Sequence, residues 1–387
     1  MGKKKVRIGM IGYKFVAKAH SHAFRDLPFY FDPETVPVLQ AIAGRNEDGV
    51  REAAEKMGFA SYETDWRRLI ERDDIDLIDI VSPNHTHAEI AIAAAEAGKH
   101  VFCEKPLAMT LSEAKRMLEA VQKAGVVHMI GHAYRYAPAV QYAKKLISEG
   151  RLGKIYHIRA TYLQDFIINP DFPLVWRLRK DVTGSGALGD IAAHILDLAR
   201  FLVGEFTEVT SMMETFIKER PLEKASFGLK AIGDKTAKGT VEVDDATAFL
   251  ARFENGALGV FDATRVAAGN RNGNRFEING EKGSIRWDLE NMNNLQVYFT
   301  DDEPGLQGFR TINCTEEHHP YAGAYWPPGL IIGYEHTFIN LMSDLMDGIT
   351  NGYSPSPNFV DGVRNQAVLD AVEKSANSRQ WEKIERE

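Results

Sequence analysis

Three ionisable side chains stand where they could move a proton: Lys105, Asp190 and His194. Lys105 follows the apolar stretch 100–103 and precedes Pro106, which favours an extended backbone at the lysine. Asp190 and His194 are four residues apart, a spacing that places both on one face of a helix. An ammonium, a carboxylate and an imidazole together can move a proton and stabilise an alkoxide. Each residue also has a simpler interpretation: Lys105 in an exposed loop, Asp190 as a helix cap, and His194 as a core histidine.

A dinucleotide-binding turn is indicated by the segment 7–20, RIGMIGYKFVAKAH. The fingerprint G-x-G-x-x-G/A needs glycine for a tight turn, glycine for close approach to a pyrophosphate, and a small residue for helix packing. Gly12 and Ala17 fit the first and third positions, but Lys14 occupies the second. A lysine there reduces the closeness of approach and adds positive charge beside a phosphate held at the helix N-terminus. By itself, the segment is equally compatible with an ordinary strand-to-helix turn.

The end of the second expected strand bears on the choice of dinucleotide. An NAD site carries Asp or Glu there to bind the ribose hydroxyls. This chain has Ala43, Gly44, Arg45 and Asn46 instead. An arginine can hold a 2′-phosphate through paired hydrogen bonds, so the sequence favours NADP over NAD. The simpler interpretation is a solvated loop arginine.

The elements that must position these residues begin with alternating strand and helix patterns. Strands are expected at 6–11, 38–43, 75–81, 100–103 and 126–130, and helices at 15–26, 48–57, 65–71, 87–97 and 111–123. This alternation predicts a doubly wound parallel sheet, with ligands beyond the carboxyl ends of its strands. We therefore expect an α/β Rossmann domain over residues 1–131.

After Gly131 the pattern becomes that of an α+β domain, over residues 132–387. Helices are expected at 138–149, 190–203 and 359–375, and strands at 155–163, 208–216, 246–253, 257–263, 274–279, 284–288 and 295–299. Turns such as Asn255-Gly256 indicate hairpins, and hence an antiparallel or mixed sheet. The polar, glycine-dotted segment 218–241 is expected to be a mobile excursion.

Bulk composition narrows the range of partners. The 387 residues suit two domains, and a net charge of −8 without a basic stripe argues against nucleic acid. No apolar run approaches the roughly 20 residues of a membrane helix. Cys103 and Cys314 are too few for a disulfide framework, which fits a cytoplasmic protein. His85 with His87, and His318 with His319, lack a third ligand, so no metal site is expected.

Three segments together resemble one family: IGMIGYKFVAKAH at 8–20, SPNHTHAEIAIAAAEAGKHVFCEKPLAMT at 82–110, and GSGALGDIAAHILD at 184–197. Their order and spacing are similar to the Gfo/Idh/MocA oxidoreductases (glucose-fructose oxidoreductase, inositol dehydrogenase, rhizopine catabolism), and Glu-Lys-Pro after a strand is their most specific motif. YLQDF at 162–166, VWRLRKD at 175–181 and HPY…WPPG…GYEH at 319–336 resemble the branch with levoglucosan dehydrogenase and sugar 3-dehydrogenases. Lys14 and Gly44 depart from the common NAD pattern.

The resemblance implies a Rossmann domain followed by an α+β domain with a large, open, mainly antiparallel sheet. It implies reversible oxidation of a secondary alcohol of a sugar or polyol, with the hydride passed to NAD or NADP. The catalytic set falls on Lys105, Asp190 and His194. In the expected mechanism, His194 is the acid/base, Asp190 orients it, and Lys105 polarises the substrate oxygen. The family also implies a homodimer or homotetramer formed through the second domain's sheet.

Further site residues are expected around these three, each with a core or surface role as its alternative. The expected cofactor contacts are Gly12, Tyr13, Lys14, Phe15, Val16, Arg45, Ser82, Pro83, Asn84, His87, Glu104, Lys105, Trp176 and Arg177. The expected substrate contacts are Lys105, Tyr134, Arg135, Gln164, Asp165, Asp190 and His194.

Three other functions stay open on the sequence. An NAD-dependent glycosidase would use the same fold and transient redox chemistry. A non-enzymatic regulator that binds NAD(P) or a sugar would not need Lys105 and His194. A metal-dependent hydrolase would need a metal centre that the sequence does not indicate.

Overall fold

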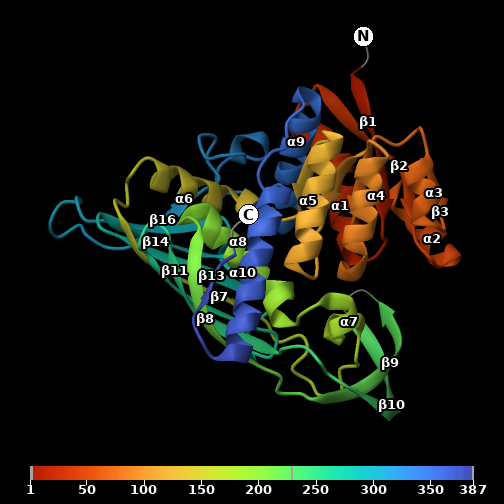
Figure 1. Ribbon diagram of the computed structural model, residues 1–387. Helices are drawn as coiled ribbons and strands as arrows, with labels where there is room; N and C mark the ends of the chain where they lie inside the picture. The colour runs from red at the N-terminus through yellow and green to blue at the C-terminus, as the bar shows by residue number, and fades with distance from the viewer. Residues whose placement is uncertain (1–2, 228–229, 386–387) are drawn as a thin grey trace. The chain divides into compact units, whose positions relative to one another are not determined.

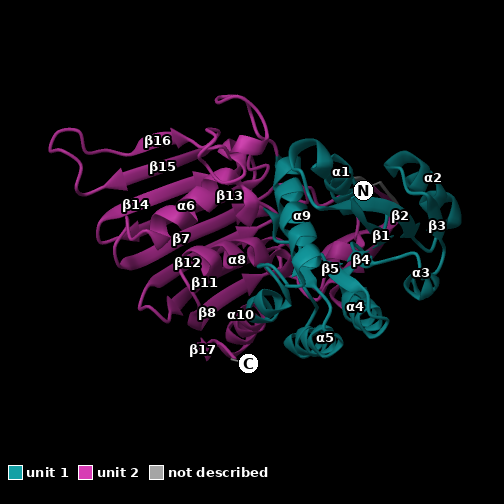
Figure 2. Ribbon diagram, turned by 90° about the horizontal axis from the view of Figure 1, so that it is seen from above, with its two compact units in different colours: residues 1–133, 334–366 teal, residues 134–333, 367–387 magenta. Residues whose placement is uncertain are grey.

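The structure, a computed structural model, describes residues 3–227 and 230–385, and these form two compact units (Figure 2). Unit 1 comprises Met1–Ala133 with Tyr334–Gln366, and unit 2 comprises Tyr134–Gly333 with Ala367–Glu387. The sequence places the first boundary two residues earlier, at 131. It also places 334–366 in the second domain, whereas this segment packs within unit 1.

Unit 1 is built on a six-stranded parallel sheet, as the alternating pattern predicts. Its strands are β1 (Lys4–Ile11), β2 (Thr35–Ala43), β3 (Ser61–Glu63), β4 (Leu77–Ile80), β5 (His100–Cys103) and β6 (His128–Ile130), in the order β3-β2-β1-β4-β5-β6. Its helices are α1 (Phe15–Tyr30), α2 (Glu47–Met57), α3 (Trp66–Glu71), α4 (His87–Glu96), α5 (Leu111–Ala124) and α9 (Tyr334–Asn351). The strand order reverses between β1 and β4, the place where a doubly wound sheet opens a ligand crevice.

Capping residues explain where α2 and α5 begin and end. The Asn46 side chain accepts a hydrogen bond from the backbone N–H of Gly49 at the start of α2. Thr110 does the same for Glu113 at the start of α5. Gly58 and Gly125 end the two helices in the left-handed conformation.

Helix α9 was not anticipated from the sequence. It packs against α1 and β2 within unit 1. Most of its side chains are buried, including Phe338, Leu341 and Leu345, so it supplies apolar cover that the first 133 residues leave out. Figure 2 shows α9 beside α1.

Unit 2 contains a nine-stranded sheet (Figure 1). Its strands are β7 (Ile155–Leu163), β8 (Phe206–Glu214), β11 (Ala246–Phe253), β12 (Leu258–Thr264), β13 (Gly273–Gly280), β14 (Gly283–Asp288), β15 (Asn294–Phe299), β16 (Arg310–Asn313) and β17 (Glu382–Lys383). Among these strands only β7 and β12 pair in parallel, so the sheet is mainly antiparallel as expected.

The helices of unit 2 are α6 (Pro138–Ser148), α7 (Lys180–Thr183), α8 (Ala193–Leu202) and the C-terminal part of α10 (Phe359–Ser378). Helix α6 packs against β14 and β15 of this sheet, and α8 packs against β7 and β13. Short 3₁₀ turns lie at Asn84–Thr86, Ala133–Tyr136, Trp176–Leu178, Leu289–Asn291 and Ala322–Ala324. In β11 buried and more exposed residues alternate, so the opposite sheet face is open, with Leu250, Leu258 and Val260 about half exposed.

The segment 218–241 differs from the expected mobile excursion. It contains a two-stranded antiparallel sheet of β9 (Glu219–Phe227) and β10 (Lys230–Thr240). Arg220 is fully buried and donates hydrogen bonds to the carbonyls of Ile167, Asn169 and Phe172. The polar, glycine-dotted sequence therefore does not indicate this two-stranded sheet, which the buried Arg220 ties to the carbonyls of residues 167–172.

None of the helices in the described ranges is long and apolar enough to cross a membrane.

Candidate active site

The turn after β1 has the geometry of a phosphate-binding turn. Gly12 has a φ of 112°, and a Cβ atom there would lie 2.7 Å from the carbonyl oxygen of Val81. Only glycine fits so close to β4 in this conformation. Ala17 is fully buried in α1, as its position in the fingerprint predicts. The first turn of α1 has no acidic residue and no side-chain cap, so its backbone N–H groups suit an anion.

Tyr13 explains the missing acid at the end of β2. A Cβ atom on Gly44 would lie 2.3 Å from the Tyr13 ring, and one on Gly49 would lie 3.1 Å from it. Any larger side chain at position 44 would have to displace the ring. The Lys14 ammonium lies 5.1 Å from the centre of the same ring, within cation–π range. Lys14 thus stands at the position of the second glycine of the common pattern, and the Tyr13 ring fills the space beside Gly44 where the acid of that pattern would stand.

A pocket of about 710 Å³ opens at the carboxyl ends of β1, β2, β3 and β4, all within unit 1. Six of the expected cofactor residues line it: Gly12, Tyr13, Lys14, Arg45, Ser82 and Pro83. Lining residues that the sequence reasoning missed include Asn46, Thr64, Asp65, Trp66, Arg67, His85, Thr86 and Glu89. Residues 64–67 follow a strand of the same parallel sheet, which is the signal that could have found them.

The charged side chains that line this pocket differ in whether other groups of the protein already bind them. Arg45 is exposed at the end of β2. Asp65 accepts a hydrogen bond from the backbone N–H of Arg67, at 3.0 Å. Glu89 pairs with the Arg67 guanidinium at 2.7 Å. Both carboxylates among the lining residues are therefore engaged by the protein itself.

The other expected cofactor contacts of unit 1 do not line this pocket. Phe15 and Val16 begin α1, and Asn84 is buried. His87 is buried, with its two ring nitrogens 3.0 Å from the Pro106 carbonyl and 2.9 Å from the Ser82 carbonyl. Burial lowers the pKa of His87, and its ring lies between the loops that contain Ser82 and Pro106.

Lys105 follows β5, at the carboxyl edge of the same sheet, and is half-buried. Its backbone N–H donates to the Glu104 carboxylate at 3.0 Å. Glu104 is itself buried and hydrogen-bonded to His20. The structure therefore places Glu104, an expected cofactor contact, inside unit 1 beside the lysine.

In unit 2, Asp190 and His194 lie on consecutive helical segments. Asp190 is in a π-helical turn, Leu188–Ala192, and His194 is in the first turn of α8. π-Helical turns occur often at functional sites. A Cβ atom on Gly186 would lie 1.9 Å from the Asp244 carbonyl oxygen, so only glycine fits where the chain before the π-helical turn passes the backbone of Asp244. The Asp244 carboxylate accepts the backbone N–H groups of Gly186 and Leu188.

Aromatic rings surround His194. The Tyr134 ring centre lies 4.5 Å from that of His194, and the Tyr162 ring centre lies 5.8 Å away. The two tyrosine hydroxyls are 2.9 Å apart, and Tyr162 donates to Asn272 at 3.3 Å. Gln164 donates to the same Asn272 oxygen at 2.7 Å. The expected substrate residues Tyr134 and Gln164 therefore belong to one polar chain beside the imidazole.

Arg265 is a buried cation that the sequence reasoning missed. It is fully buried and lies 3.2 Å from the Asp190 carboxylate. It also donates to the carbonyls of Asp244 and Arg177, at 3.3 and 3.4 Å. No local pattern marks it, because it follows a strand far along the chain from Asp190.

The remaining expected residues have other partners. Arg135 is buried and forms two 2.6 Å hydrogen bonds with Asp197, which is the geometry of a core ion pair. Asp165 pairs with Arg271 at 3.1 Å. The Arg177 guanidinium lies 4.4 Å from the Trp176 ring centre, and burial lowers the pKa of Arg177.

The described residues contain no group of three or more His, Cys, Asp or Glu side chains placed to hold a metal ion. The adjacent rings of His318 and His319 lie 4.3 Å apart, centre to centre.

Comparisons with known proteins agree with this architecture. Residues 6–132 match the oxidoreductase family with an NAD-binding Rossmann fold, and residues 140–286 match the GFO/IDH/MocA C-terminal domain. Levoglucosan dehydrogenase of Pseudarthrobacter phenanthrenivorans is 47% identical over 97% of each chain. Myo-inositol 2-dehydrogenase of Thermotoga maritima is 29% identical over 98% of this chain and 99% of its own.

Solved structures extend the likeness to the whole fold. An oxidoreductase domain protein from Kribbella flavida has 50% identity and a TM-score of 0.94, over 99% of this chain and 100% of its own. A levoglucosan dehydrogenase in complex with NADH and levoglucosan has 45% identity and a TM-score of 0.94, with the same coverage. The identity to these relatives extends along nearly the whole chain, both domain models match it, and its first sheet has the Rossmann strand order. The chain therefore belongs to the Gfo/Idh/MocA family of oxidoreductases.

Proposed function

We propose that this protein reversibly oxidises a secondary alcohol of a sugar, sugar derivative or polyol by hydride transfer to a nicotinamide dinucleotide. The observation that carries the proposal is the unit 1 pocket, where Gly12, the uncapped start of α1 and Arg45 meet at the switch point of the sheet. When bound, the nicotinamide accepts or returns the hydride. Family membership and the named sugar and polyol dehydrogenases among the relatives support the same reaction class.

In the proposed reaction, His194 takes the proton of the substrate hydroxyl during oxidation. A neutral imidazole can accept a proton near pH 7. Asp190 orients His194 and stabilises the imidazolium, and Arg265 in turn holds the Asp190 carboxylate at 3.2 Å. Lys105 donates a hydrogen bond to the same substrate oxygen and stabilises its developing negative charge.

The substrate side of the proposal rests on the polar chain beside His194. The hydroxyls of Tyr134 and Tyr162 and the amides of Asn272 and Gln164 offer donors and acceptors that suit a ligand rich in hydroxyl groups. Arg135 is left out of the substrate contacts, because Asp197 already takes its guanidinium within the core.

For the cofactor, we propose that Arg45 gives NADP an advantage over NAD. Arg45 is exposed at the pocket, and Arg67 already engages Asp65 and Glu89, so the β2 end has a cation and no uncommitted acid among its lining side chains. The relative solved with levoglucosan contains NADH, which makes the direct comparison of kcat/KM for NAD and NADP the first experiment.

The test of the reaction is a panel of alcohols read by the absorbance of the reduced nicotinamide. Levoglucosan heads the panel, followed by inositols, hexoses and alkyl glycosides. Net cofactor reduction that disappears in His194→Ala, with cofactor binding retained, is the expected outcome. Release of an aryl alcohol from aryl glycosides without net reduction would instead assign a glycosidase. Ligand binding without any turnover would assign a regulator.

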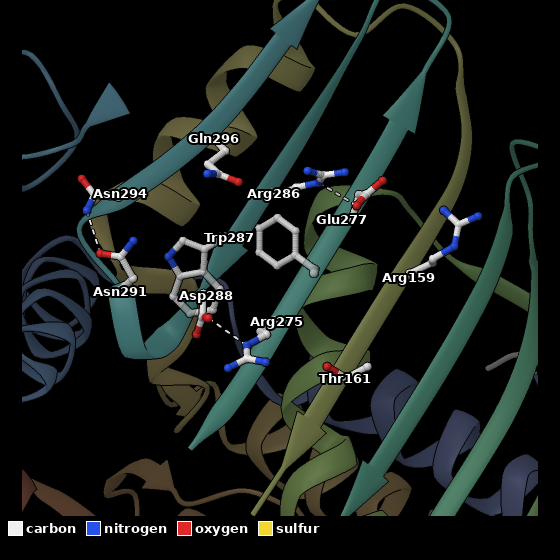
Figure 3. A pocket seen from close by; sticks show the side chains of 11 residues that line it. Arg159, Thr161, Arg275, Glu277, Arg286, Trp287, Asp288, Asn291, Asn294 and Gln296 are labelled. Atoms are coloured by element: carbon white, nitrogen blue, oxygen red, sulfur yellow. Dashed lines mark hydrogen bonds and ion pairs between the residues drawn. The ribbon is translucent and has the colours of Figure 1, made fainter. Parts of the chain in front are cut away.

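We also propose that copies of the chain assemble through the open face of the nine-stranded sheet. This face presents the half-exposed Leu258 and Val260. On the same sheet, a hollow of about 410 Å³ is bordered by ion pairs, Arg286 with Glu277 and Arg275 with Asp288, each at 2.7 Å (Figure 3). Apolar side chains beside complementary charges suit a self-complementary interface.

Light scattering of the wild type and of Val260→Glu tests this assembly. Loss of a dimer or tetramer in the variant, with an unchanged circular dichroism spectrum, is expected.

The compartment that we propose is the cytoplasm, because Cys103 and Cys314 are both buried free thiols.

A further inference from the structure

Three ionisable side chains are buried together in unit 1, and one of them, Glu104, directly precedes Lys105 in the sequence. His20 comes from α1, Asp79 from β4 and Glu104 from the residue after β5. His20 and Asp79 are fully buried, and Glu104 is 8% exposed. The His20 Nδ1 atom lies 3.1 Å from both Asp79 carboxylate oxygens, and Nε2 lies 3.1 Å from Glu104 Oε1.

A protonated histidine satisfies both carboxylates of this arrangement. A neutral imidazole has one N–H and could satisfy only one of the two carboxylates, whereas an imidazolium donates to both. Burial lowers the pKa of His20, but the attraction and hydrogen bonds of Asp79 and Glu104 outweigh burial and raise it to about 10. Removing the cation would leave two buried carboxylates without their partner, which is strongly unfavourable.

Glu104 joins this cluster to Lys105. Its Oε1 atom accepts from His20, and its Oε2 atom accepts from the Lys105 backbone N–H at 3.0 Å. Its own backbone N–H donates to the Ile80 carbonyl at 2.9 Å. A Cβ atom on Gly131 would lie 2.5 Å from Oε1, so the backbone there closes the remaining side. The carboxylate therefore has one defined place.

We propose that His20 is a positioning residue for catalysis: it fixes the Glu104 carboxylate, which fixes the backbone from which the Lys105 ammonium reaches its substrate. This rests on the proposed role of Lys105. Glu104 is then a support for Lys105 rather than a cofactor contact. Neither Glu104 nor His20 lines the unit 1 pocket, so the cluster acts on turnover and leaves dinucleotide affinity alone.

The first test displaces the Glu104 carboxylate without substituting any ionisable residue. Gly131→Ala puts a methyl group where the Glu104 oxygen lies, and the flexible carboxylate end is what must move. Gly308→Ala is the matched control, because a Cβ atom there meets nothing within 4 Å. We expect kcat to fall about 10- to 100-fold in Gly131→Ala, since small misplacements of a reacting group cost this much. The dissociation constant of the reduced dinucleotide, measured by fluorescence, should stay at the wild-type value.

The second test asks whether His20 acts through Glu104. His20→Gln and Glu104→Gln should each lower kcat, and the double variant should lose no more than the worse single variant. A purely structural role predicts instead that melting temperature and dinucleotide affinity fall while kcat of the bound enzyme is kept. If His20→Gln does not fold, Gly131→Ala decides alone.

Two results would overturn the inference: a kcat of Gly131→Ala equal to that of Gly308→Ala, or kcat losses that multiply in the double variant. Lys105→Met separates this inference from the function on which it rests. Full activity in Lys105→Met refutes the role of the lysine. An inactive Lys105→Met beside a fully active Gly131→Ala refutes only the positioning role of the cluster.

Discussion

The buried imidazolium of His20 makes a specific prediction for stability against pH. Its pKa is raised from 6.5 to about 10 in the folded protein, through Asp79 and Glu104 acting against burial. A group whose folded pKa is raised contributes stability that is complete below the unfolded pKa and is lost as pH rises through the folded pKa. The window is therefore about pH 6.5 to 10, and the direction is loss of stability toward alkaline pH.

The magnitude follows from linkage. Each pKa unit corresponds to about 1.4 kcal/mol, so ionisation of His20 contributes on the order of 4 kcal/mol at pH 7 and less than about 1 kcal/mol at pH 10. The free energy of unfolding should fall by about 1.4 kcal/mol per pH unit in this range from His20 alone. Other groups titrate as well, and a variant comparison removes their shared contribution.

The assay is urea unfolding followed by circular dichroism, from pH 7 to pH 10, for the wild type, His20→Gln and His22→Gln. His22 lies on the same helix with a ring that solvent reaches, and serves as the matched control. His20→Gln should be much less stable than the wild type at pH 7, and the gap should nearly close by pH 10. A gap that stays constant with pH would refute a protonated His20, and an equal effect in His22→Gln would refute its assignment to the buried cluster.

Three further outcomes concern the site directly. His194→Ala should lower turnover about 10²- to 10⁴-fold with dinucleotide affinity kept, and unchanged turnover in steady-state kinetics would remove it as the acid/base. Arg265→Met removes the cation beside Asp190, a charge-assisted hydrogen bond worth about 1.5–3 kcal/mol, so kcat/KM should drop about tenfold or more in a protein that still binds cofactor. Arg45→Asp should move the kcat/KM preference from NADP toward NAD, and equal kinetics with both cofactors in the wild type would contradict the role of Arg45.

Local sequence determined the framework of unit 1. The alternation of apolar strands with capped helices predicts a parallel sheet, and the structure has it in the Rossmann order. Gly12 and Ala17 could be assigned from the sequence because the turn conformation and the helix–strand contact depend on residues within one βα unit. The carboxyl-edge position of Lys105 follows from the same rule.

Only the tertiary structure decided which polar residues support others. From the sequence, Glu104 is expected to contact the cofactor. In the structure, His20 binds Glu104 inside unit 1, and Asp79 binds the other nitrogen of the His20 ring. Arg265 has no neighbouring motif, and its pairing with Asp190 arises from the fold of a separate strand end. Side-chain burial and ion pairing depend on contacts between residues distant in the chain, and sequence spacing carries no information about those distances.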